Sequence, residues 1–133
     1  MKKIILYISF SLFVVSLTQV AYCTPNLCRS SLDAFLTGTL GMFYGGAALV
    51  WLANPFLFIS WILIKRKPKF VLPFSGLATL IGLSFMLISG IVDNEAGHVN
   101  KIIELKVGYY IWILSMISTL IYAIINRSGH IKQ

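Results

Sequence analysis

The sequence predicts an all-α integral membrane protein: a helical bundle with three transmembrane helices after a signal peptide, or four if that first segment is retained. The composition is 58% hydrophobic and 11% charged, whereas soluble domains are about 45–50% apolar and about 25% charged. The apolar residues form four blocks, 4–17, 34–64, 70–92 and 107–125, with the charged residues between them. A chain of 133 residues has room for one domain.

The first block, 4–17, follows the basic start Lys2-Lys3 and precedes TQVAYC. A short apolar region between basic and small residues is typical of a signal peptide, and cleavage after Cys23 would place Ala21 and Cys23 at the small-residue positions. The alternative is a retained signal anchor, although this block is short of the about 20 residues that a crossing needs. We therefore expect a signal peptide or signal anchor over 1–23 and a single helical transmembrane domain over 24–133.

The second block is too long for one upright crossing and too short for two, so we expect one tilted or kinked helix over about 36–64. Asn54 and Pro55 predict the kink, because Pro55 has no N–H for the carbonyl of Trp51 and its ring crowds that turn. The Asn54 amide is a candidate donor to the freed carbonyl. Two interpretations stay open: a broken helix that lines a site, as in transporters, or a kink that serves packing.

The third and fourth blocks each suit a single crossing, over about 70–92 and 107–125. Small residues recur at helical spacing along the second and third blocks. Such residues let helix backbones approach closely, within one chain or between chains. The predicted helix-packing positions are Gly41, Gly45, Gly46, Ser75, Ala78 and Gly82.

The loops differ in charge, and this difference predicts the orientation. The N-terminal tip, the 65–69 connection and the tail contain no acidic residue. Their basic residues are Lys2, Lys3, Lys65, Arg66, Lys67, Lys69, Arg127 and Lys132. The other two connections hold Arg29, Lys101 and Lys106 with the acids Asp33, Asp93, Glu95 and Glu104. Because Lys and Arg are enriched in cytoplasmic loops, we expect the 65–69 connection and the C-terminus in the cytoplasm.

The outer connections then face a compartment that permits disulfides. Cys23 and Cys28, in CTPNLC, are close enough in sequence to form a small disulfide-bonded loop. Cleavage after Cys23 would remove one partner and leave Cys28 as a lone thiol. A Cys23–Cys28 disulfide and that cleavage therefore exclude each other.

The 93–106 connection contains Asp93, Glu95 and His98, which are weak candidates for a divalent metal site. Their spacing matches no strong metal signature, and Gly97 indicates a turn, so we expect a solvated loop and no bound metal. We expect residues 99–106 to form a short surface helix. Its apolar residues, turned toward lipid, would be Val99, Ile102, Ile103 and Leu105.

Several function classes are disfavoured by the sequence. No ionisable Asp, Glu, Lys, Arg or His lies inside 34–64, 70–92 or 107–125, whereas pumps and proton relays require such groups. No nucleophile–base arrangement or phosphate loop is visible, so we expect neither an enzyme nor a cofactor. The net charge of +7 does not indicate nucleic-acid binding, because the basic residues lie in the gaps between apolar blocks rather than over one face.

Three phrases, WLANPFLFISWILI, DNEAGHVNKI and GYYIWILSM, resemble a pattern found in small bacterial multi-pass membrane proteins of no established function. The resemblance covers about residues 43–120. It rests on Trp51, Asn54, Pro55, Asn94, Glu95, Gly97, Gly108, Tyr109 and Trp112. It implies a bacterial origin and a helical membrane fold, and it carries no catalytic residues.

These observations favour a small non-enzymatic protein of the bacterial inner membrane, acting through helix–helix contacts as an accessory subunit or envelope factor. Its expected partners are the lipid bilayer and another membrane protein or a second copy of itself, with no nucleic acid. Two alternatives remain. One is an immunity-type protector against a pore-forming toxin, by analogy alone. The other is a small channel or carrier that uses a broken helix at Asn54-Pro55.

Overall fold

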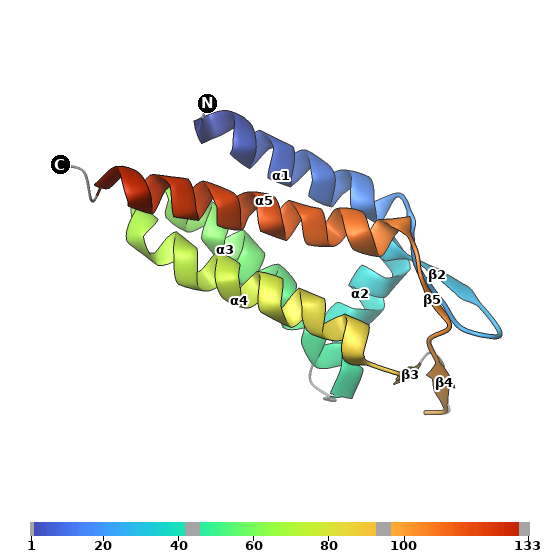
Figure 1. The fold of residues 1–133 in the computed structure, drawn as a ribbon. Coiled ribbons are helices and arrows are strands. Elements are labelled where there is room, and N and C mark those ends of the chain that lie inside the picture. Colours follow the sequence, from blue (N-terminus) through green and yellow to red (C-terminus); the bar gives the residue numbers. More distant parts are fainter. Residues whose placement is uncertain (1, 42–45, 93–96, 131–133) are drawn as a thin grey trace.

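The computed structural model describes residues 2–41, 46–92 and 97–130, and it shows a mostly helical chain with short strands at one end (Figure 1). The α-helices are α1 (Lys2–Leu17), α2 (Ser31–Gly41), α3 (Ala53–Arg66), α4 (Val71–Ser84) and α5 (Val107–His130). The 3-10 helices are η2 (Gly46–Leu52), η3 (Pro68–Phe70) and η4 (Phe85–Leu87). Because η2 leads into α3 and η4 follows α4, each pair forms one long helical stretch.

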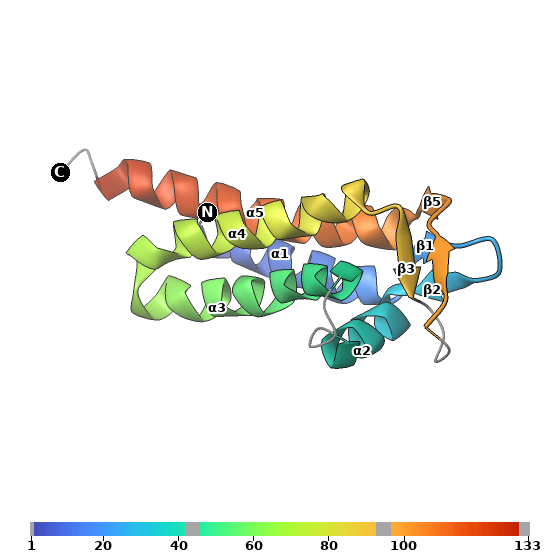
Figure 2. The ribbon, with the colours of Figure 1, turned by 90° about the horizontal axis from the view of Figure 1, so that it is seen from below.

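Helices α1, α3, α4 and α5 lie side by side as a bundle, and α2 lies across one end of it (Figure 2). α1 packs along α5, while α3 and α4 form a hairpin through η3. The packing has a core of fully buried side chains, among them Leu57 of α3, Ala78 of α4 and Met116 of α5. The outward faces of the helices remain apolar, which is the pattern of a bundle surrounded by lipid.

Three helical stretches are long and apolar enough to cross a membrane: Gly46–Arg66, Pro68–Leu87 and Val107–Arg127. They correspond to the predicted crossings over 36–64, 70–92 and 107–125. The first block forms the shorter apolar helix Lys3–Leu17. At about 1.5 Å per residue this helix extends over roughly 22 Å, which is less than the about 30 Å of a hydrocarbon core.

The bounds of two predicted crossings need correction. Residues 31–41 form the separate helix α2, and the first long apolar stretch begins at Gly46, whose φ of 64° is outside the helical range. The stretch Pro68–Leu87 ends at Leu87, and Ile88 turns to an extended conformation. Gly90–Val92 then forms a strand, so it does not continue the crossing. The conformation of Gly46 marks the start of the first stretch, and the pairing of Gly90–Val92 with β4 follows the end of the second. Hydropathy registers neither feature.

The sheet lies at the end of the bundle opposite the α3–α4 turn (Figures 1 and 2). Strands β1 (Val20–Cys23), β2 (Cys28–Ser30) and β5 (Glu104–Leu105) form an antiparallel sheet in the order β2-β1-β5. Strands β3 (Gly90–Val92) and β4 (Val99–Lys101) form a separate antiparallel pair. The segments between α1 and α2 and between α4 and α5 are therefore joined to each other.

Two sequence predictions missed these strands. The all-α prediction holds for most of the chain but omits the sheet. The surface helix predicted for 99–106 is wrong, because β4 and β5 occupy this segment. The backbone N–H of Ile102 donates to the carbonyl of Ser89, and that of Ile103 donates to the carbonyl of Cys23. Pairing with distant strands thus satisfies the backbone groups that a local helix would have satisfied.

Asn54 and Pro55 lie where the 3-10 turns of η2 pass into α3, inside the continuous helical stretch Gly46–Arg66. α3 begins at Ala53, so Pro55 is in its first α-helical turn. Leu52, the residue before α3, is itself helical with φ −58° and ψ −20°, so Pro55 lies at the junction of two helix types. The helix changes from the 3-10 form of η2 to the α form of α3 before Pro55 is reached.

Candidate functional site: the aromatic end of the bundle

Trp112 and Asn54, which belong to two of the motifs distinguished in the sequence, meet at the sheet end of the bundle. Trp112 Nε1 of α5 donates a 2.8 Å hydrogen bond to Asn54 Oδ1 of α3. The Trp112 ring also lies 6.0 Å from the ring of Trp51, measured between centroids. Asn54 is only 3% exposed, so this hydrogen bond is inside the helix packing. It joins the WLANP segment to the GYYIW segment.

Tyr109 of α5 links helix α4 to the same end of the bundle. Its hydroxyl donates a 3.0 Å hydrogen bond to the carbonyl of Gly82 in α4. The ring of Tyr109 stacks at tilted angles on Phe85 and on Trp112, with centroids 5.7 Å and 6.0 Å away. A buried phenol in an apolar place needs such an acceptor. Helices α3, α4 and α5 are therefore joined by hydrogen bonds through aromatic side chains at one level.

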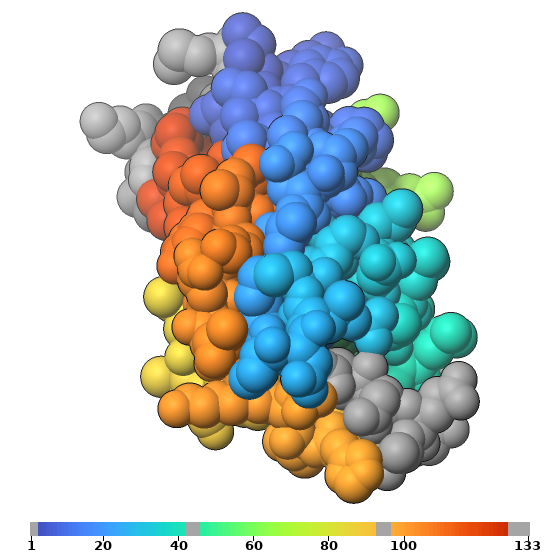
Figure 3. Space-filling view, turned by 90° about the vertical axis from the view of Figure 1, so that its right-hand side faces the viewer, coloured from blue at the N-terminus to red at the C-terminus, as the bar shows by residue number. Residues whose placement is uncertain are grey.

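The sheet contributes the outer wall of this aromatic end. Tyr22 of β1 is 5% exposed, and its ring lies 5.8 Å from that of Phe85. Figure 3 looks at this end of the molecule and shows the blue segment near residue 20 packed against the orange segment near residue 105, in accordance with the β1–β5 pairing. We use the name aromatic end for Tyr22, Phe35, Trp51, Phe85, Tyr109 and Trp112.

The aromatic end contains a half-open cavity of about 40 Å³ that all six residues line. Ser31 of α2 contributes a buried hydroxyl, which makes no hydrogen bond within the described part of the chain. A Cβ on Gly108 would overlap both this hydroxyl and the carbonyl of Val20, so only glycine fits at that position. The volume suits two or three water molecules or a small neutral group. The arrangement provides apolar contact and, in the Ser31 hydroxyl, a group that could hydrogen-bond to an occupant.

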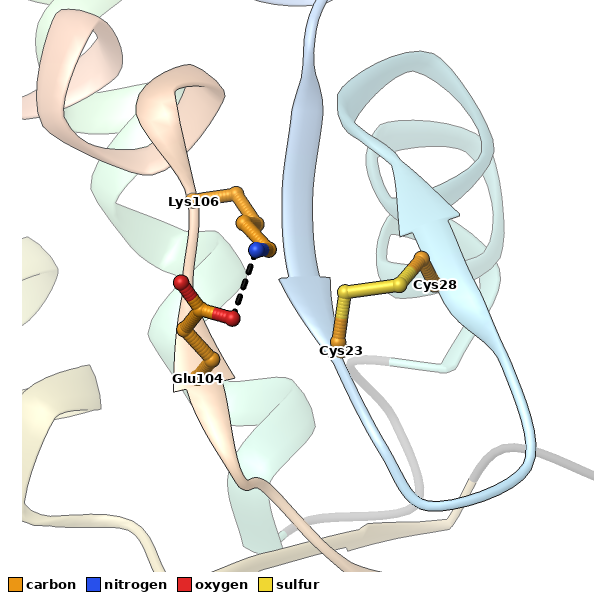
Figure 4. A network of polar contacts seen from close by, with 4 residues as sticks. All are labelled: Cys23, Cys28, Glu104 and Lys106. Carbon is orange, nitrogen blue, oxygen red and sulfur yellow. Dashed lines mark ion pairs between the residues drawn. A yellow bond between two sulfur atoms is a disulfide. The ribbon is translucent and has the colours of Figure 1, made fainter.

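A disulfide joins strands β1 and β2 outside the cavity, and an ion pair lies along the β5 segment beside them (Figure 4). Cys23 and Cys28 face each other across the β1–β2 hairpin and are joined by the disulfide. On the other side of β1, the Lys106 ammonium forms an ion pair with the carboxylate of Glu104. The sequence left the disulfide and signal-peptide cleavage as exclusive alternatives. The structure contains the disulfide together with a folded α1.

A second polar cluster, which sequence reasoning missed, joins α1 to the bundle. Ser9 donates to the carbonyl of Ser115 at 2.7 Å and lies 2.7 Å from the Thr119 hydroxyl. Trp61 Nε1 of α3 lies within hydrogen-bonding distance of both hydroxyls. Ser9, Ser115 and Thr119 are fully buried. Because residues 1–23 were interpreted as a signal peptide or signal anchor, no packing role was assigned to Ser9. Ser9, Phe13 and Ser16 nevertheless follow helical spacing on one face.

Three of the six predicted packing residues are buried in the described structure. Ser75, Ala78 and Gly82 are buried on the face of α4 that meets α3 and α5. Gly41 approaches Ala48, while Gly46 has open space around it. Gly45 lies outside the described residues.

The remaining predicted residues are away from the aromatic end. Lys65, Arg66, Lys67 and Lys69 are exposed around the α3–α4 turn, at the opposite end of the bundle. His98 is exposed next to Gly97, whose φ is 74°. Asp93 and Glu95 lie outside the described residues, and within the described ranges no three His, Cys, Asp or Glu side chains group as metal ligands.

The fold and the site define a class: a small helical protein with three helices long and apolar enough to cross a membrane, closed at one end by an aromatic cluster under a disulfide-bonded sheet. No protein family, curated protein or solved structure matches the chain.

Proposed function

We propose that the chain is a small non-enzymatic protein of a bacterial inner membrane, which acts through helix–helix contacts as an accessory subunit or envelope factor. One observation carries this proposal: the side chains of Ser9, Tyr109 and Trp112 each donate a hydrogen bond to another helix of the chain, so the polar groups between the helices serve helix packing. Transport sites instead place polar or charged groups around a pathway. The resemblance of the WLANP and GYYIW segments to bacterial multi-pass proteins supports the bacterial setting.

The outward face of α4 is the surface that we assign to a partner helix. Leu77 and Leu80 are exposed on it, and Leu87 of η4 continues the same ridge. A Cβ on Gly76 would meet open space, so a second helix has room to approach the backbone there. Close approach at small residues is the usual basis of helix association in lipid. The partner is another membrane protein or a second copy of the chain.

The distribution of charge supports an orientation with the C-terminus in the cytoplasm. The exposed basic residues around the α3–α4 turn lie at the same end of the bundle as the C-terminus (Figures 1 and 2). The disulfide and the acidic Glu104 lie at the other end. Basic residues favour the cytoplasmic side, and disulfides persist in the compartment outside it.

Site-specific photo-crosslinking in cells tests the proposal. A photoreactive amino acid at Leu80, which is 67% exposed, should give a defined protein adduct that mass spectrometry identifies. The matched control is the same amino acid at Met116, which is fully buried and should give no adduct with another chain. Lipid adducts alone at Leu80 and at its neighbour Leu77 would overturn the proposal.

A further inference from the structure

The end of the bundle opposite the sheet contains a hollow of about 950 Å³, which the proposed function does not use. It lies between the α3–α4 turn and the last turns of α5, two segments that are far apart in the sequence and adjacent in space. Small-molecule sites are commonly about 300–1,000 Å³. The hollow therefore has the size of a ligand site, and its lining residues indicate the ligand.

Its lining is basic. Arg66, Lys67 and Lys69 surround the turn, and Arg127 approaches from α5, together with the amide of Asn126. Among the described residues, no acidic side chain lines the hollow. Among the described residues, the ion pair between Lys106 and Glu104 lies at the opposite, sheet end of the bundle. The basic residues therefore repel one another without a compensating carboxylate, and an anion between them would relieve that repulsion.

The hollow also has an apolar rim, at the level where the long apolar stretches end. It lies beside Arg66, Pro68 and Arg127, where the three apolar stretches end. Phe70 and Leu72 line its side toward α4, and Phe70 is 42% exposed. The Lys69 ammonium lies 5.3 Å from the centre of the Phe70 ring, so a charged and an apolar group share this wall. A ligand with an anionic head and an apolar tail fits both.

We propose that this hollow binds the phosphate of an anionic phospholipid, with its acyl chains along Phe70 and Leu72. Basic pockets between helices at the cytoplasmic side are suited to such headgroups. Arg66 and Arg127 provide planar donors that pair with phosphate oxygens, while Lys67 and Lys69 provide point charges. A zwitterionic headgroup carries a positive charge of its own, which these basic residues would repel, so it should bind more weakly. The site needs the membrane setting but no partner helix.

Lipid binding to the purified full chain tests this assignment. Native mass spectrometry from detergent micelles would measure the retention of phosphatidylglycerol against phosphatidylcholine. Each basic residue near a membrane surface contributes a factor of about five in binding. The double substitution Lys67→Gln/Lys69→Gln should therefore weaken phosphatidylglycerol retention by about 25-fold. The charge-conserving pair Lys67→Arg/Lys69→Arg should retain it.

The matched control removes two lysines at the other end of the bundle, Lys101→Gln/Lys106→Gln, and should change retention by less than about twofold. Circular dichroism verifies that each variant is folded. Equal loss in both glutamine pairs, or equal retention of phosphatidylcholine, would refute the site. Inorganic phosphate at the same concentration should not displace the lipid. Displacement by inorganic phosphate at equal strength would instead make the hollow a site for a soluble anion.

Discussion

Trp112 Nε1 donates a 2.8 Å hydrogen bond to Asn54 Oδ1 and so joins two segments 58 residues apart in the sequence. An indole N–H and a carboxamide oxygen are both costly to bury without a partner. The bond therefore fixes the register between α3 and α5 at the level of the aromatic end, while Asn54 Nδ2 is buried with no hydrogen-bond partner in the described part of the chain.

This pair gives the first prediction. Trp112→Phe removes the donor and leaves the Asn54 amide buried without it, so we expect a loss of about 1–2 kcal/mol in the free energy of unfolding. Asn54→Leu removes the acceptor, and it should destabilise the Trp112→Phe variant less than it destabilises the original chain. Unfolding in mixed micelles, followed by circular dichroism, measures all four corners of the cycle. Strictly additive losses would show that the bond contributes nothing.

Pro55 gives the second prediction, which concerns the junction between η2 and α3. The hydrogen-bond pattern changes from the 3-10 to the α form at this junction, and 3-10 hydrogen bonds have the poorer geometry, so Pro55→Ala should restore at most one weak hydrogen bond. We expect less than about 0.5 kcal/mol of change in stability. Replacing Leu57 by proline is the contrasting change, since it breaks the helix interior and should unfold α3. A gain of several kcal/mol in the Pro55→Ala variant would show that Pro55 distorts the helix.

Ser9 gives the third prediction, which concerns the attachment of α1. Ser9→Ala removes the group that bonds to the Ser115 carbonyl and the Thr119 hydroxyl. We expect a loss of about 1 kcal/mol, in the range of interhelical hydrogen bonds in membranes. Ser11→Ala is the matched control, because Ser11 is exposed on the same helix and should change stability little. Equal effects of the two substitutions would mean that the buried cluster does not hold α1.

The sequence and the structure agree on what hydropathy measures and differ where distant segments pair. Long uncharged runs predicted the three apolar stretches because their length has to match the bilayer. The strands were missed because they are two to four residues long, which is too short for alternation to be recognised. The Asn54–Trp112 bond could not be predicted either, since it depends on how two helices are rotated against each other.

The first segment was the other main uncertainty from sequence. Its composition is that of a signal peptide, and the same residues fit a short helix packed on α5. In the structure, Ser9 and Phe13 of this helix are buried against residues distant in the sequence. Predicting that burial requires the position of α5, which a pattern within residues 4–17 does not contain.

The fourth prediction therefore concerns the mature chain. We expect α1 and β1 to be retained, because β1 carries half of the disulfide and pairs with two strands. The intact mass of the protein from membranes, without reduction, should correspond to the whole chain less two hydrogen atoms. Reduction should restore those two atoms. A mass equal to that of a chain beginning at Thr24 would show cleavage after Cys23. The mature bundle would then lack both α1 and the disulfide.

The central claim is that the chain works by contact with another membrane protein or a second copy of itself. The most direct measurement is the native mass of the complex extracted in mild detergent, compared with the 14.9 kDa of one chain. We predict a defined complex of larger mass, which Gly76→Trp on the outward face of α4 should dissociate because its indole fills the open space there. A chain that runs strictly as a monomer, with no adduct from Leu80 in cells, would contradict the claim.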